Sequence, residues 1–204
     1  MAYQTIYPYT NEVLRSYESL SDAGVEEALE RAYGQYQAWQ KDNDVEKRKT
    51  VLRQVAALLR RDLERYAETM TKDMGKLFVE AQGEVELCAA IAEYYADQAD
   101  GFLAREPVET PAGKAYILKQ ARGVIMAVEP WNFPFYQVMR VFAPNFIIGN
   151  PLLLKHASNC PGSAWPLKPW YGKQGLRKGL SRACLPAMIR FPGSSRIPGW
   201  PEPA

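Results

Sequence analysis

Apolar residues in the first half of the chain recur every three or four positions, which is the spacing of amphipathic helices. This spacing predicts three helices. The first begins after a cap at Ser21 or Asp22, the second covers about Asp44–Gly75, and the third covers about Val79–Leu103. Residues 3–17 alternate loosely between apolar and polar side chains, and this alternation predicts a short hairpin.

Past residue 107 the pattern changes to that of strands. Ala115–Gln120 reads as one strand, and Val124–Val128 is a continuous apolar run of the kind found in parallel strands buried on both faces. A helical pattern follows over Phe135–Ile148, and Leu152–Lys155 closes the series as another buried strand. The sequence therefore predicts an α/β fold, in which N-terminal helices precede the beginning of a doubly wound, Rossmann-like cofactor-binding sheet.

Sheets of this kind bind ligands where their parallel strands end, and the first such strand ends at Glu129–Asn132, within the segment Glu129–Pro134. Two prolines hold this segment in a short rigid turn. Asn132, which lies between them, carries an amide that can donate a hydrogen bond to a developing oxyanion. The structural alternative is that Asn132 caps the following helix while Trp131 belongs to the core.

The second parallel strand ends at Lys155–Ser158. A lysine at this place can donate to ribose hydroxyls or to a phosphate, and the neutral Ser158 would not repel a phosphate. The alternative is a lysine that is merely solvated at a strand end. His156 is the single histidine of the chain and has no identifiable acid partner, which favours a structural role over that of a general base.

The use of cysteine excludes several kinds of site. Three cysteines at wide spacing and one histidine rule out a disulfide scaffold and argue against a zinc centre, so no metal site is predicted. Cys88 falls on the apolar face of a predicted helix, where an inert core position is expected. Cys160 lies in a turn and is expected to be partly exposed, without a neighbour that activates its thiol, and Cys184 lies near the C-terminus.

The overall composition is that of a soluble globular protein. The 204 residues are 47% hydrophobic and 24% charged, and the formal net charge of +2 argues against a nucleic-acid partner. No stretch approaches the roughly 18 to 20 apolar residues that a membrane helix needs. The first residues also lack the pattern of a signal peptide. We therefore expect a cytoplasmic protein with no membrane or nucleic-acid partner.

Residues 166–204 differ from everything before them. They contain 7 of the 15 prolines and 5 of the 14 glycines, and their net charge is +6, whereas residues 1–165 carry −4. Proline and glycine interrupt every possible helix in this tail. The composition therefore predicts a boundary after residue 165 and a basic, disordered tail beyond it.

The order of motifs in residues 123–164 is the most specific signal in the chain. A strand leads into Pro-Trp-Asn-Phe-Pro at residues 130–134, a helix follows, and a Gly149-Asn150 turn precedes a strand that ends in Lys155. This order closely resembles the NAD(P)-dependent aldehyde dehydrogenase superfamily, and the resemblance covers about residues 5–165. Within the superfamily, the segment Lys-His-Ala-Ser-Asn is most similar to the bacterial succinate-semialdehyde dehydrogenases.

The resemblance implies oxidation of an aldehyde, here succinate semialdehyde, to its acid with NADP or NAD, by enzymes that are homo-oligomers when intact. By matching position, Asn132 would supply the side-chain half of the oxyanion hole, and Lys155 would bind the adenosine ribose of the cofactor. Ser158 stands where NAD-preferring members often carry an acid, which implies that NADP is tolerated or preferred. Pro130 and Trp131 would line the nicotinamide and substrate region.

The family likeness ends near residue 165. In the family, the cysteine nucleophile, the glutamate base and the backbone donor of the oxyanion hole come further along the chain, and none of the three cysteines here occupies the nucleophile's place. We therefore expect a truncated cofactor-binding domain followed by a tail that results from a shifted reading frame, with no dehydrogenase activity of its own. The alternative is a non-catalytic nucleotide-binding or interaction protein derived from such an enzyme.

Overall fold

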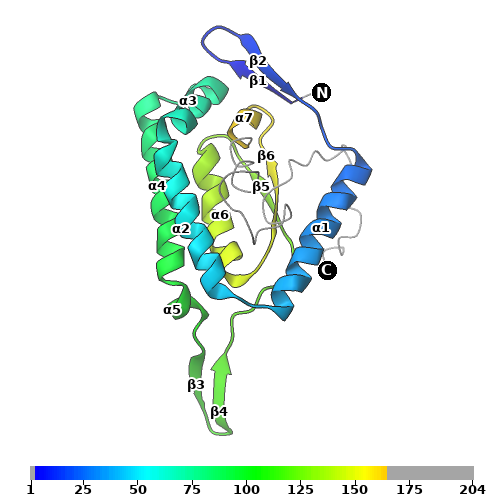
Figure 1. The fold of residues 1–204 in the computed structure, drawn as a ribbon, viewed down its shortest axis with the longest axis vertical. Coiled ribbons are helices and arrows are strands. Elements are labelled where there is room, and N and C mark those ends of the chain that lie inside the picture. Colours follow the sequence, from blue (N-terminus) through cyan, green and yellow to red (C-terminus); the bar gives the residue numbers. More distant parts are fainter. Residues whose placement is uncertain (1–2, 165–204) are drawn as a thin grey trace.

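The computed structural model describes residues 3–164 and arranges their helices and strands in layers (Figure 1). The elements are β1 (Tyr3–Tyr7), β2 (Glu12–Tyr17), α1 (Asp22–Lys41), α2 (Val45–Arg61), α3 (Leu63–Met74), α4 (Phe78–Asp97), α5 (Ala99–Leu103), β3 (Glu106–Thr110), β4 (Gly113–Ile117), β5 (Ile125–Glu129), α6 (Pro134–Ile148), β6 (Leu152–His156) and α7 (Pro161–Ala164). The expected boundary after residue 165, the tail 166–204 and Cys184 lie outside the described residues.

A parallel pair of strands, β5 and β6, lies between α6 on one side and α1 on the other (Figure 1). The strands pair in register from Ile125 opposite Leu152 to Glu129 opposite His156. The Asn150 side-chain oxygen fixes the start of this pairing, because it accepts hydrogen bonds from the backbone N–H groups of Arg122 and Gly123 at 2.7 and 3.1 Å. The parallel pair joined by α6 confirms the predicted βαβ unit and the α/β class.

The main hydrophobic core lies between α2, α4 and α6. The buried face of α4 consists largely of alanine, which lets its two neighbours approach closely, and the larger side chains come from α2 and α6. Leu52, Leu59 and Phe146 are at most 1% exposed, and burying each such side chain contributes about 1.5–3 kcal/mol. This helical layer is therefore a firm support for the strands that α6 covers.

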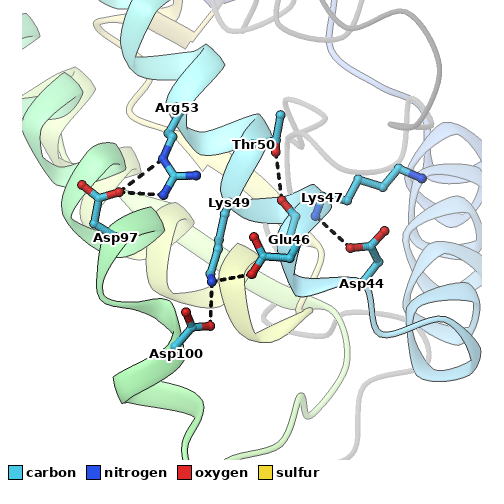
Figure 2. Close-up of polar contacts among 8 residues, drawn as sticks. All are labelled: Asp44, Glu46, Lys47, Lys49, Thr50, Arg53, Asp97 and Asp100. Atoms are coloured by element: carbon cyan, nitrogen blue, oxygen red, sulfur yellow. Dashed lines mark hydrogen bonds and ion pairs between the residues drawn. The ribbon is translucent and has the colours of Figure 1, made fainter.

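Ion pairs join the outer edges of the same helices. Figure 2 shows Arg53 of α2 facing Asp97 of α4, with Nη2 and Oδ1 2.8 Å apart. Lys49, whose side chain is 6% exposed, places its Nζ 2.6 Å from Asp100 of α5 and 2.6 Å from Glu46. Asp44 begins α2 as its N-cap by accepting from the backbone N–H of Lys47 at 2.8 Å, as the sequence predicts.

Two of the predicted helices are broken, which corrects the sequence prediction. The helix expected over 44–75 ends at Arg61, and Asp62 has non-helical torsion angles while its carboxylate pairs with Arg61 and Arg65. The break lets α3 turn away from α2 and contact β1 and α7, while its Tyr66 and Met70 are buried in the main core. The helix expected over 79–103 is likewise divided at Gln98 into α4 and α5.

The strand predictions need two further corrections. The strand expected over 115–120 is present as β4, but it covers Gly113–Ile117 and not 118–120. It pairs with β3 in an antiparallel hairpin that projects from one end of the molecule and is exposed on both faces (Figure 1). β5 is less buried than its apolar run predicts, because Val128 is 62% exposed. The hairpin expected over 3–17 and the Ser21 cap of α1 are confirmed.

Candidate functional site

The two segments proposed from the sequence lie beside each other at one edge of the sheet. Glu129, the last residue of β5, pairs with His156, the last residue of β6. The segment 130–133, here called the β5 turn, and the segment 157–160, here called the β6 turn, therefore leave neighbouring strand ends. Pro130, Trp131 and Asn132 are exposed there.

Asn132 does not cap α6, so the structural alternative for this residue is wrong. The residue at the N-cap position is Phe133, and no side chain from the turn itself caps the helix. Trp131 is 52% exposed and is not a core residue either. Within residues 3–164 the Asn132 amide has no hydrogen-bond partner, which leaves its N–H groups available at the carboxyl edge of the sheet.

A buried carboxylate from α4 takes the capping role instead. The Oε1 atom of Glu84 accepts from the backbone N–H groups of Phe135 and Tyr136 at 2.8 and 2.9 Å. Its Oε2 atom pairs with the Nζ of Lys76, and both side chains are buried. The same Nζ lies 3.7 Å from the centre of the Phe133 ring, a cation–π contact.

His156 connects the β6 turn with Pro134, the first residue of α6, directly after the β5 turn. Its Nδ1 accepts from the backbone N–H of Ala157 at 2.8 Å, so Nε2 carries the proton and donates to the carbonyl oxygen of Pro134 at 2.9 Å. Burial lowers the pKa of His156, which keeps the ring neutral. Because both ring nitrogens are used in this way, the histidine is structural, in agreement with the sequence-based preference.

A second buried carboxylate holds the chain beyond the β6 turn. Asp73 of α3 accepts from the Ser163 backbone N–H at 2.7 Å and its hydroxyl at 2.9 Å, and from the Gly162 N–H at 3.2 Å. The Thr5 hydroxyl of β1 donates to the same carboxylate at 2.6 Å. Burial raises the pKa of Asp73, and these hydrogen bonds oppose that rise.

Lys155 and Ser158 offer a cation and a neutral hydroxyl at this edge. Lys155 is half-buried and forms no ion pair with any residue from 3 to 164, and Ser158 is exposed. Such a pair suits the ribose and phosphate of a dinucleotide, because it supplies donors and places no carboxylate three residues from the lysine. In the described part of the chain no group of acidic, cysteine or histidine side chains is arranged to hold a metal ion.

The described cysteines are both free and buried. Cys88 lies in the core, as predicted. Cys160 is 0% exposed, which corrects the expectation of partial exposure, and its Sγ contacts the Nδ1 of His156 at 3.2 Å. Burial raises the pKa of both thiols, so neither has the properties of an activated nucleophile.

Sequence reasoning did not identify Lys76, Glu84 or Asp73 as parts of the site. The spacing of buried residues along the helices does, however, indicate that the two acids, Glu84 and Asp73, are buried. Glu84 lies four residues before Cys88 and three after Ala81, so it falls on the buried face of α4, and Asp73 follows the buried Met70 by three residues. An acid on a buried helical face indicates a partner elsewhere in the fold, although the sequence does not say which one.

Comparisons with known proteins agree with the family-level resemblance. The Aldehyde dehydrogenase family profile matches residues 1–185. The chain is 38% identical over 177 residues to the succinate-semialdehyde dehydrogenase [NADP(+)] of Deinococcus radiodurans, covering 87% of this chain and 37% of the relative. It is 37% identical to that of Mycobacterium avium, covering 91% of this chain and 40% of the relative. The chain thus spans about two fifths of the length of these curated relatives.

A similar solved structure is the succinic semialdehyde dehydrogenase of Streptococcus pyogenes in complex with NADP+ as the cofactor. It superimposes with a TM-score of 0.87 at 57% sequence identity, over 93% of this chain and 41% of that one. No helix among residues 3–164 is long and apolar enough to span a membrane.

Proposed function

Because the chain belongs to the aldehyde dehydrogenase family, we propose that it supplies part of the cofactor and oxyanion sites of an NADP-dependent succinate-semialdehyde dehydrogenase. The single observation that carries the proposal is the parallel pairing of β5 and β6, which ends at Glu129 and His156. It brings a free asparagine amide and an unpaired lysine to neighbouring strand ends, where sheets of this class bind their ligands.

Asn132 is the proposed side-chain donor of the oxyanion hole. Aldehyde oxidation in this family begins with a thiolate attack on the carbonyl carbon, and the negative charge then develops on the carbonyl oxygen. An amide N–H that is fixed beside this oxygen stabilises the charge. The absence of a competing partner for the Asn132 amide among residues 3–164 supports this role.

Lys155 and Ser158 are the proposed cofactor contacts. NADP+, when bound, accepts a hydride from the substrate. The Lys155 ammonium would donate to the adenosine ribose or its 2′-phosphate, and Ser158 would leave room for that phosphate without repelling it. Pro130 and Trp131, both exposed beside Asn132, are the proposed lining of the nicotinamide and substrate region. The names of the compared relatives, which carry NADP(+), support the choice of cofactor.

The cofactor proposal is tested by measuring NADP+ and NAD+ dissociation constants for the 204-residue chain and three variants. Lys155→Met should weaken NADP+ binding about ten- to a hundredfold, because charge-assisted hydrogen bonds are lost. Ser158→Glu should weaken NADP+ far more than NAD+, since only NADP+ carries the 2′-phosphate. Lys114→Met, which removes an exposed lysine of the β3–β4 hairpin, is the matched control and should change neither. Equal affinities in all four proteins would overturn the cofactor assignment.

We further propose that these 204 residues do not oxidise aldehydes by themselves. Cys88 and Cys160 are buried, with thiol pKa values raised by that burial, and an acyl-transferring cysteine must be an accessible thiolate. Purified chain mixed with succinate semialdehyde and NADP+ should therefore form no NADPH above the blank. A measurable rate would contradict this expectation and direct attention to Cys184.

The proposal includes a cytoplasmic location, which is supported by the two free cysteines of the described region. It also includes assembly into homo-oligomers in the intact enzyme, as the family resemblance implies. Size-exclusion chromatography with light scattering measures the oligomeric state directly.

A further inference from the structure

We infer that the buried Lys76–Glu84 ion pair is a positioning device for Asn132, an inference that rests on the oxyanion role proposed above. The pair takes over the capping of α6 and fixes the residues that follow Asn132. The backbone next to Asn132 is thereby held in place, while the Asn132 side-chain oxygen is not drawn towards the N–H groups of α6.

Both carboxylate oxygens of Glu84 accept hydrogen bonds inside the protein. Oε1 receives two backbone N–H groups of the first turn of α6, from Phe135 at 2.8 Å and Tyr136 at 2.9 Å, and Oε2 receives the Lys76 ammonium. The Glu84 side chain is 0% exposed and that of Lys76 is 7% exposed. In such surroundings a carboxylate and an ammonium hold each other firmly, because neither can be solvated if the pair separates.

The same pair also reaches the residue next to Asn132. The Lys76 Nζ lies 3.7 Å from the centre of the Phe133 ring, and the Pro134 carbonyl accepts from His156 at 2.9 Å. Every residue from 133 to 136 therefore has a contact that fixes it to another element. The Asn132 side chain, immediately before this run, has no partner among residues 3–164.

The Glu84 cap explains why Asn132, which directly precedes Phe133 and α6, does not cap this helix. An asparagine just before a helix tends to accept, through its side-chain oxygen, from the first N–H groups of that helix, and this bond would turn its amide towards α6. An oxyanion donor must instead stay free and point in a fixed direction before the charge develops. A carboxylate supplied by α4 satisfies the N–H groups of α6, so the asparagine is released from that task.

The test compares two double variants of the 204-residue chain that differ in one acceptor. Lys76→Met with Glu84→Gln removes both charges but keeps an amide oxygen for the N–H groups of α6. Lys76→Met with Glu84→Leu has a similar volume and leaves no acceptor. Hydrogen exchange of the Phe135 and Tyr136 amides should be about tenfold faster or more in the leucine variant.

A spectroscopic readout reports on Asn132 itself. In protein labelled with 15N-asparagine, the Asn132 side-chain signal is identified by its loss in Asn132→Ala. The signal should keep its wild-type position in the glutamine double variant, and it should shift or broaden in the leucine double variant. Exchange of the Val55 amide, deep in α2, serves as the control for global loosening and should be equal in the two proteins.

Equal exchange at Phe135 and Tyr136, or an unmoved Asn132 signal in the leucine variant, would overturn the inference. If the leucine variant does not fold, Glu84→Gln with Lys76 retained replaces it, and exchange at both amides should rise several-fold because a neutral acceptor is weaker. These readouts need no catalysis. Failure of the oxyanion proposal would appear separately, as activity that survives Asn132→Ala in the intact enzyme while the positioning effect stands.

Discussion

The two turns at the edge of the sheet are supported in the same way but with different electrostatics. Each is followed by a helix whose first N–H groups are received by a buried carboxylate from the N-terminal helices, Glu84 for α6 and Asp73 for α7. Glu84 is neutralised by Lys76, whereas Asp73 receives only neutral donors from Thr5, Gly162 and Ser163. The N-terminal helices thus hold the residues that follow both turns. Because only Glu84 has a cationic partner, we expect substitutions at the two carboxylates to change the stability of the protein by different amounts.

The largest effect is expected from breaking the paired carboxylate. Glu84→Ala leaves the Lys76 ammonium buried without its partner and should lower the free energy of unfolding by about 3–5 kcal/mol. Chemical denaturation measures this loss of stability. Glu86→Ala, on the same helix, removes a carboxylate that pairs with Arg60 at a half-exposed position and should cost about 1 kcal/mol or less. Similar losses in the two variants would mean that Glu84 has no special importance.

A smaller effect on stability is expected from a substitution that crowds Asp73, the carboxylate without a cationic partner. A Cβ atom at Gly162 would lie 2.9 Å from both the Asp73 Oδ1 and the Thr5 Oγ1, so Gly162→Ala should cost about 1–3 kcal/mol of stability. Gly83→Ala is the matched control, because a Cβ atom there meets nothing within 4 Å and alanine in a helix should stabilise by up to about 1 kcal/mol. Denaturant titration that gives the same sign for both substitutions would contradict this account of the β6 turn.

The smallest effect is a pH dependence that separates the groups of the two turns. The pKa of His156 is lowered by burial from its ordinary 6.5, so the unfolded chain binds more protons, and His156 contributes stability above that pH which is lost as the pH falls. The pKa of Asp73 is raised from its ordinary 3.8, so its contribution is present at low pH and is lost as the pH rises through the folded-state value.

The corresponding measurement is Tm against pH for the wild type, His156→Gln and Asp73→Asn. Between pH 7.5 and 5.5 the wild type should lose stability by at most about 1.4 kcal/mol per pH unit below 6.5, and His156→Gln should lack this loss. Asp73→Asn should lack the decline that accompanies rising pH above about 4. Parallel curves for all three proteins would show that neither group is linked to folding in this way.

The sequence predicted the strand ends but could not predict what holds them. The apolar run before Pro130 and the strand before His156 define a parallel pair from local pattern alone, which is why Asn132 and Lys155 were found as candidates. The caps of α6 and α7 come from residues 51 and 90 positions away in the sequence. No local pattern encodes such contacts, because they depend on how α4 packs on α6 and how α3 packs on α7.

The helix breaks have the same explanation. Periodicity continues through Asp62 and Gln98, so the pattern predicts unbroken helices there. The chain turns at these points because α3 must reach β1 and α7, and α5 must lead into the β3–β4 hairpin. Burial of Cys160 was likewise missed, since a Ser-Asn-Cys-Pro-Gly segment reads as a surface turn until His156 is placed beside it.

The most direct test of the proposed cofactor edge is a titration of the 15N-labelled 204-residue chain with NADP+, followed by two-dimensional NMR. If the two turns hold the dinucleotide, the backbone signals of residues 129–134 and 155–158 should move with increasing NADP+. In Lys155→Met the same movement should require about ten- to a hundredfold more NADP+. Signals that move only elsewhere, or that move equally in Lys155→Met, would contradict the assignment of this edge as the NADP site.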